Sequence, residues 1–200
     1  MNKRRSLPKV QQKEIRGLLK IYRQIDKDIA AFKKRTALSC LPACGECCRT
    51  ACVYVSVLEM QPVAAHLWET GEMDYWLDKI DRKDERAACV FYSAEVLENG
   101  GHCRIYPFRP LLCRLFGFSG RENKRQKVEL MLCGRMKAAR PEQVARVEAL
   151  PEKKVRVPLS MNYLMKTYAV SPQLANEGLN INLAFAKAAE RIGLYGELSA

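Results

Sequence analysis

A chain of 200 residues, 48% of them hydrophobic, is long and apolar enough for one globular domain with an appended segment. Its formal net charge of +12 permits contact with nucleic acid, acidic protein or a membrane surface but establishes none of them. No stretch approaches the ~20 apolar residues of a membrane span, and the polar N-terminus is not typical of a secretory signal. We therefore expect a cytoplasmic protein, in which clustered cysteines bind metal more often than they form disulfides.

The first predicted element is one long helix over residues 9–35. Its apolar residues recur at alternating steps of three and four, which is the spacing of a single helix face. They are Ile15, Leu18, Tyr22, Ile25, Ile29 and Phe32. We expect this face to pack on its own domain; a coiled-coil contact with a protein partner is the alternative.

The next segment, 40–52, carries Pro42 and Gly45 and predicts a loop wrapped around a bound group. Residues 53–57 predict a short extended piece. Ser56 and Glu59 predict a capping box that begins a helix. That helix should end near Gly71, and a second should run over 72–86.

Residues 89–106 suggest short strands around the turn AsnGlyGly, which would bring Cys89 and Cys103 together. Residues 127–133 predict another strand, and most of the remaining chain predicts helices. The apolar positions of those helices are Leu159, Tyr163, Leu164, Tyr168, Ile181, Leu183, Phe185 and Ile192.

The predicted fold is mainly α with short strands and irregular loops (α+β), built on a small cysteine-rich metal-binding core. Three parts are expected along the chain. They are an N-terminal basic amphipathic helix (1–36), a cysteine-cluster metal-binding domain (37–140) and a helical C-terminal segment packed on the core (141–200).

Four of the nine cysteines lie within nine residues and give the spacing CxxxCxxCC. They are Cys40, Cys44, Cys47 and Cys48. Gaps of two and three residues let a tight loop point several sulfurs at one centre, as in zinc sites and iron–sulfur clusters. Gly45 permits a positive φ or a close approach of the backbone. The side chains of Cys47 and Cys48 would point opposite ways in an extended segment. The two thiols could therefore bind two different metals, or one of them could be a structural thiol.

The remaining cysteines carry weaker signals. Those at ligand-like positions, beside a proline-rich loop or at a strand end, are Cys103, Cys113 and Cys133. Cys89 lies in an apolar run, where a lone thiol is usually a buried hydrophobe, and Cys52 is predicted to be structural. With only His66 and His102 in the chain, a His-rich catalytic zinc site is disfavoured. An all-thiolate centre selects zinc or iron–sulfur.

The sequence resembles the YkgJ-type CxxCxxCC cysteine-cluster family, described as a zinc- or iron-chelating domain. The resemblance rests on the run 40–48, on Cys89, on GlyHisCysArgIleTyrProPheArgProLeuLeuCysArgLeuPhe (101–116) and on Cys133. The first cysteine gap is three residues here and usually two in the family. The resemblance implies a [4Fe–4S] cluster or zinc and a pool of ligands. That pool is Cys40, Cys44, Cys47, Cys48, Cys89, Cys103, Cys113 and Cys133.

Two arginines, Arg109 and Arg114, bracket Cys113 and are candidate cofactor-binding residues. A cluster held by thiolates carries negative charge in a poorly solvated loop, and fixed guanidinium groups would offset that charge. A surface salt bridge is the alternative role for them.

The sequence thus predicts a cysteine-ligated metal-binding protein that carries an iron–sulfur cluster or zinc, with its reaction unassigned. Some flagellin lysine methylases are similar in the cysteine region, which implies a lysine N-methylase-like enzyme using S-adenosylmethionine as one alternative. The spacing of Cys40, Cys44 and Cys47 matches radical S-adenosylmethionine enzymes, but the strands and helices of their barrel are not predicted. A nucleic-acid-binding zinc module is a further alternative, disfavoured because paired CxxC…CxxC spacing is missing.

Overall fold

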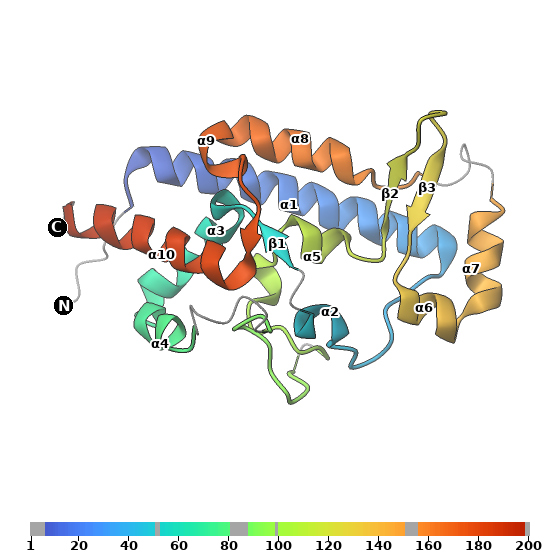
Figure 1. The fold of residues 1–200 in the computed structure, drawn as a ribbon, viewed down its shortest axis with the longest axis horizontal. Helices are drawn as coiled ribbons and strands as arrows, with labels where there is room; N and C mark the ends of the chain where they lie inside the picture. Colours follow the sequence, from blue (N-terminus) through green and yellow to red (C-terminus); the bar gives the residue numbers. More distant parts are fainter. Residues whose placement is uncertain (1–6, 51–52, 81–87, 99, 151–155, 199–200) are drawn as a thin grey trace.

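The computed structural model describes residues 7–50, 53–80, 88–98, 100–150 and 156–198. Helix α1 (Lys9–Thr36) runs along most of the molecule, with α8 beside it, α3 and α10 towards one end and α6 and α7 at the other (Figure 1). The helices after α1 are α2 (Glu46–Arg49), α3 (Val57–Thr70), α4 (Met73–Asp78), α5 (Leu111–Leu115), α6 (Gly134–Ala139), α7 (Pro141–Glu148), α8 (Ser160–Val170), α9 (Pro172–Ala175) and α10 (Ile181–Leu198). A 3-10 turn, η1, spans Tyr106–Phe108. The mainly α fold with short strands is confirmed.

Helix α1 confirms the long N-terminal helix. Its face of Leu18, Tyr22, Ile25, Ile29 and Phe32 is buried against the chain's own α3, α5 and α8. This face forms one of two hydrophobic cores. The other members of this α1 core include Leu58, Leu111, Leu115, Phe118, Met136 and Tyr163. None of the helices that the structure describes is both long and apolar enough to cross a membrane.

The second hydrophobic core lies between α3 and α10, which pack closely along their lengths. Its centre includes Val63, Phe91, Phe185 and Ile192, all without solvent exposure. The ring of Phe91 packs edge-on against that of Phe185, with centroids 4.9 Å apart. The two cysteines Cys89 and Cys103 are buried in this α3–α10 core.

The strands form two small antiparallel pairs. Strand β1 (Tyr54–Val55) pairs with β4 (Leu179–Asn180), and β2 (Ser119–Glu122) pairs with β3 (Val128–Met131). The extended pieces predicted at 53–57 and 127–133 are therefore present. Among the described residues, the strands expected within 89–106 reduce to one bridge between Tyr92 and Cys103.

Two predictions about helices need correction. The cysteine run is not all loop, because Glu46–Arg49 forms the single helical turn α2. The helix predicted over 72–86 is present but shorter: α4 ends at Asp78, and residues 81–86 lie outside the described part of the chain.

The predicted capping box at the start of α3 is present and has a second role. The buried Glu59 carboxylate accepts hydrogen bonds from the Ser56 backbone N–H (2.9 Å) and the Ser56 hydroxyl (2.8 Å). It also accepts one from the backbone N–H of Leu111 (2.9 Å), the first residue of α5. Glu59 therefore connects the N-termini of two helices, and α5 is the helix that carries Cys113.

Burial raises the pKa of Glu59 above its ordinary value of 4.5, although these hydrogen bonds lower it in part. The folded protein thus keeps this proton to a higher pH than the unfolded chain. The stability linked to the proton is full below about pH 4.5 and is lost as pH rises through the folded-state pKa. We expect the stability of the wild type relative to Glu59→Gln to fall as pH rises above 4.5 and through the folded-state pKa. Urea unfolding of both proteins checks this, and a relative stability that rises with pH would contradict it.

Candidate metal centre

The cysteine run contains the single helical turn α2. The residue with a positive φ in this run is not the glycine that the sequence suggested. The positive φ falls on Ala43 (49°), whereas Gly45 has a φ of −95°. Gly45 is needed for close approach: a Cβ there would lie 2.8 Å from the His102 ring and 2.9 Å from the Tyr92 ring. The second of the two reasons expected for Gly45 is therefore the one that the structure supports.

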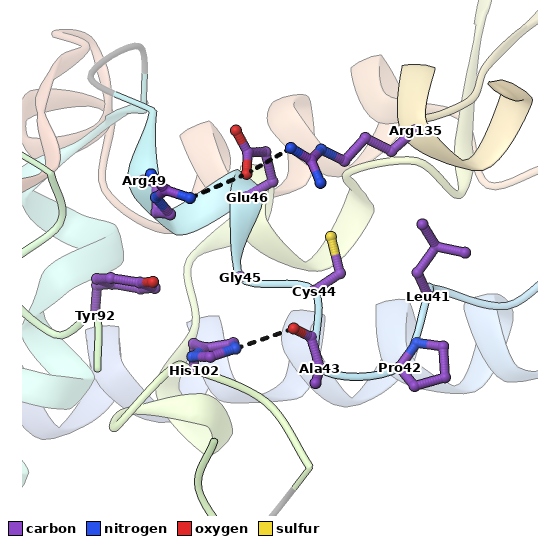
Figure 2. A pocket seen from close by; sticks show the side chains of 10 residues that line it. All are labelled: Leu41, Pro42, Ala43, Cys44, Gly45, Glu46, Arg49, Tyr92, His102 and Arg135. Atoms are coloured by element: carbon purple, nitrogen blue, oxygen red, sulfur yellow. Dashed lines mark hydrogen bonds and ion pairs between the residues drawn. The ribbon is translucent and has the colours of Figure 1, made fainter. Parts of the chain in front are cut away.

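His102 ties the cysteine run to the segment that precedes Cys103. Its Nε2 lies 3.0 Å from the carbonyl oxygen of Ala43 (Figure 2). Its Nδ1 lies 2.8 Å from the carbonyl oxygen of Ser93. The ring also stacks on Tyr92, with centroids 5.5 Å apart. Since both ring nitrogens face backbone carbonyls, His102 positions the loop, and neither nitrogen is directed at the thiols.

Four cysteines from four separate segments, here called the inner group, gather at the α3–α10 core. They are Cys48, Cys89, Cys103 and Cys113. Cys89 and Cys103 are buried in that core, and Cys48 and Cys113 are partly buried against it. The backbone N–H of Cys89 donates to the carbonyl of Cys48 (3.2 Å), and the Cys48 thiol is hydrogen-bonded to that of Cys103. The expected approach of Cys89 and Cys103 is part of this arrangement.

Three of the inner thiols, those of Cys48, Cys89 and Cys113, are held in their protonated form by their surroundings. Contact with the Cys103 thiol and burial raise the pKa of Cys48 to about 11. Burial and the neighbouring thiols of Cys48 and Cys47 raise the pKa of Cys113 to about 12. Burial also raises the pKa of Cys89 well above its ordinary value. Metal binding at these thiols must therefore release protons.

The other four cysteines, here called the outer group, lie nearer the surface. They are Cys40, Cys44, Cys47 and Cys133. Cys40 is exposed and the others are partly buried. Burial raises the pKa of Cys40, and the neighbouring thiols Cys44, Cys47 and Cys133 raise it further, so all four lie within electrostatic range. The Cys47 thiol is hydrogen-bonded to Cys48, which makes this adjacent pair the junction between the two groups.

The two predicted cofactor arginines have different surroundings. Arg109 lies over the Tyr106 ring, with its guanidinium carbon 3.5 Å from the centroid. Its positive charge acts on Cys47, Cys48 and Cys113, where it counteracts the increase in pKa caused by burial and thiol contacts. Arg109 therefore lies where it could offset thiolate charge.

Arg114 is buried, with only 3% of its side chain exposed. Its three guanidinium nitrogens donate to the Asp26 carboxylate and to the carbonyls of Pro107 and Arg109 (2.7 Å for Arg109). The guanidinium also lies over the Tyr22 ring. These partners are on α1 and in the loop before α5, so Arg114 fixes the loop that carries Arg109.

The donor chemistry suits a thiophilic metal. The eight cysteines that the structure describes are thiols rather than disulfides, and Cys52 lies outside the described residues. In the described part of the chain, no three His, Cys, Asp or Glu side chains are placed to hold one metal ion. Loading therefore requires the thiol hydrogen bonds to break and the sulfurs to turn towards a common centre.

A cavity of about 350 Å³ opens beside the outer group. It is lined by the 41–46 turn, including Cys44, and by His102, Tyr92, Arg49 and Arg135. Glu46 lies between two arginines in this wall, 3.7 Å from Arg49 and 3.0 Å from Arg135 (Figure 2). The Cys44 side of the site is therefore open to small solutes.

The contrast between Gly45 and Ala43 gives a matched pair of variants. Gly45→Ala should push the His102 ring off the Ala43 carbonyl and destabilise the protein by about 1–3 kcal/mol, because the new Cβ overlaps two rings. Ala43→Gly, two residues away, should be neutral or stabilise by up to about 1 kcal/mol, because it relieves a left-handed backbone. Thermal unfolding of both variants checks this, and equal effects would show that the close approach is unimportant.

Comparison with known proteins agrees with the cysteine pattern. Residues 39–134 match the CxxCxxCC family, whose description is "Putative zinc- or iron-chelating domain". Neither the curated proteins nor the solved structures give a match to the chain. The matched segment contains both cysteine groups, α2 and the Arg109–Arg114 loop. The segment 39–134 of this chain is therefore similar to the CxxCxxCC family, which is described as a zinc- or iron-chelating domain.

Proposed function

We propose that this protein is a metal carrier or redox protein that binds an iron–sulfur cluster, of the [4Fe–4S] type, through the inner group. The observation that carries the proposal is the gathering of Cys48, Cys89, Cys103 and Cys113 at one apolar core. Four thiolates are the usual ligand set of such a cluster. The reaction or pathway that it serves is unassigned.

Burial favours a cluster over a simple ion at the inner group. Apolar surroundings and low solvent exposure tune the potential of iron–sulfur clusters, and Phe91 and Ile105 belong to the same core as these cysteines. The thiols are also gathered without converging on a point that would suit one ion. A cluster of several irons accommodates more widely separated sulfurs than a single tetrahedral zinc does.

The Arg109 side chain would offset part of the charge of a thiolate-bound cluster. It acts electrostatically on two inner thiols, Cys48 and Cys113, and it remains partly exposed above Tyr106. Arg114 would act indirectly, by holding the carbonyls of Pro107 and Arg109. We therefore assign Arg109 to the charge balance of the cofactor and Arg114 to the position of its loop.

Purification of the full chain without oxygen tests the proposal. We expect a brown protein that absorbs near ~400 nm and contains iron and acid-labile sulfide, since these follow from thiolate-ligated clusters. A colourless protein with stoichiometric zinc would replace the cluster by a structural zinc site. A protein without metal whose cysteines are paired as disulfides would overturn metal binding altogether.

A further inference from the structure

We propose that the outer faces of α1 and α8 form a docking surface for a membrane that contains anionic lipids. This surface, here called the α1–α8 surface, combines a row of basic side chains on α1 with an exposed apolar face on α8. The two helices run side by side along the molecule (Figure 1). The inference involves neither the cysteines nor a metal, so it is independent of the proposed cluster.

The first observation is a row of exposed basic residues on the outer face of α1. The members of this row recur at alternating steps of three and four, as the buried face of α1 does, but on the opposite side of the helix. They are Lys9, Lys13, Arg16, Lys20, Arg23 and Lys27. At a rise of about 1.5 Å per residue, the row is about 27 Å long.

The acidic residues of α1 do not neutralise this row, because each of them has a partner in another element of the fold. Their pairs are Glu14 with Arg191, Asp26 with Arg114, and Asp28 with the hydroxyl of Tyr163. Among the described residues, no acidic side chain lies within ion-pair distance of the basic row. The outer face of α1 therefore carries positive charge that the fold leaves unbalanced.

The second observation is the exposed apolar face of α8. Its four members have the spacing i, i+3, i+4 and i+7, so they share one side of the helix. They are Met161 (60% exposed), Leu164 (44%), Met165 (59%) and Tyr168 (43%). The buried Tyr163 packs into the α1 core, and α8 contains no acidic residue. An exposed apolar helix face together with basic side chains is typical of elements that lie in a membrane interface.

Contacts at both ends of α8 fix it along α1. Near its start, the Tyr163 hydroxyl donates a hydrogen bond to the Asp28 carboxylate. At its end, Val170 lies so close to Gly17 that a Cβ on this glycine would be 3.3 Å from it. The two helices are therefore antiparallel neighbours, and the apolar face keeps a fixed position beside the basic row.

An anionic lipid surface satisfies both parts of the α1–α8 surface at once. Its headgroups supply negative charge at every point, and the boundary between headgroups and acyl chains accepts apolar side chains. A nucleic-acid backbone would neutralise the basic row but leave the apolar face of α8 uncovered. A protein partner would need acidic residues that match the spacing of the row, beside an apolar stripe of its own. Charge and apolar character together therefore favour the membrane.

The test measures sedimentation of the full chain with lipid vesicles. Vesicles of phosphatidylcholine with about 30% phosphatidylglycerol are compared with vesicles of phosphatidylcholine alone, each at low and at high salt. The surface variants are the double variants Lys20→Glu with Arg23→Glu and Met161→Ser with Met165→Ser. Matched controls change exposed residues of α7 and α10 in the same way. They are Arg146→Glu with Lys187→Glu, and Leu183→Ser with Leu194→Ser. Thermal unfolding shows whether each variant is folded.

We expect the wild type to bind the anionic vesicles at low salt, to be released at high salt, and not to bind the neutral vesicles. The charge-reversal variant of α1 should bind at least about 30-fold more weakly, because two attractive charges near the lipid surface are lost. The apolar variant of α8 should bind about 5-fold to 10-fold more weakly. Both control variants should bind as the wild type does.

Four results would overturn the inference. The first is a wild type that binds neutral vesicles equally well, or binds neither kind. The second is an unchanged affinity in either surface variant. The third is an equal loss in the charge control, which would show that net charge alone is responsible. The fourth is binding of a DNA duplex or of polyglutamate by a protein that does not bind vesicles, which would assign the basic row to a nucleic acid or an acidic protein.

Discussion

Replacing Arg114 by methionine should lower the free energy of unfolding by about 3 kcal/mol, one of the two largest effects that we expect. Methionine has a similar length but donates no hydrogen bonds. The carbonyls of Pro107 and Arg109 would lose their donor, and Asp26 would lose its ion-pair partner. Since the side chain is only 3% exposed, water could not easily replace these contacts. Urea unfolding at neutral pH measures the loss.

The matched control is Arg109→Met, which removes the same group five residues earlier. The Arg109 side chain donates one hydrogen bond, to the Tyr106 carbonyl (3.1 Å), and stacks on the Tyr106 ring. Such contacts near the surface are worth about 0.5–1 kcal/mol. We expect Arg109→Met to lower stability only slightly but to change the properties of the metal centre. We expect Arg114→Met to act mainly by lowering stability. Equal losses of stability in the two variants would contradict these separate roles.

The second large effect is expected for Cys113→Ser, which should abolish the absorption near ~400 nm and lower Tm by about 10 °C. Cys113 is the proposed inner ligand that α5 supplies, and α5 is fixed by Glu59 and Arg114. A hydroxyl is a poor ligand for iron or zinc compared with a thiolate. Loss of the metal removes binding energy that the folded state alone receives, so stability falls with metal content.

Cys52→Ser is the matched control for this experiment, because the sequence predicts a structural role for Cys52 outside the ligand set. It should leave metal content and absorption nearly unchanged. Normal metal loading of Cys113→Ser would remove Cys113 from the ligands. Loss of metal in Cys52→Ser would show that Cys52 contributes to metal binding and that the predicted ligand set is wrong.

The sequence was most informative where a local pattern has a single physical solution. The stripe from Leu18 to Phe32 has helical spacing, and it is the buried face of α1. Ser56 and Glu59 have the spacing of a capping box, and both of its hydrogen bonds are present. The cysteine pattern predicted the CxxCxxCC family, which the match over 39–134 confirms.

The sequence was least informative where the outcome depends on contacts between distant segments. The hydrogen bond from Leu111 to Glu59 spans 52 residues, and nothing near Glu59 in the sequence signals it. The role of His102 depends on the Ala43 carbonyl, 59 residues away. Among the apolar positions of α8, Tyr163 is buried, whereas Leu164 and Tyr168 are exposed. Periodicity shows that residues share a face but not which element covers it.

The candidate site shows the same division. Spacing identified the cysteine run as a ligand segment, and the resemblance added the distant cysteines. Their division into inner and outer groups depends on the α2 turn and on the contacts of α6 and α7, which the sequence did not predict. From the sequence alone, the adjacent Cys47 and Cys48 were compatible with two metals or with one metal and a structural thiol.

X-ray absorption spectroscopy at the iron and zinc edges, on the full chain purified without oxygen, tests the central claim most directly. We expect sulfur as the only nearest scatterer at the bound metal, with a short iron–iron distance that marks a cluster. Nitrogen or oxygen ligands at the bound metal, or a protein that holds neither iron nor zinc, would contradict a thiolate-bound metal protein.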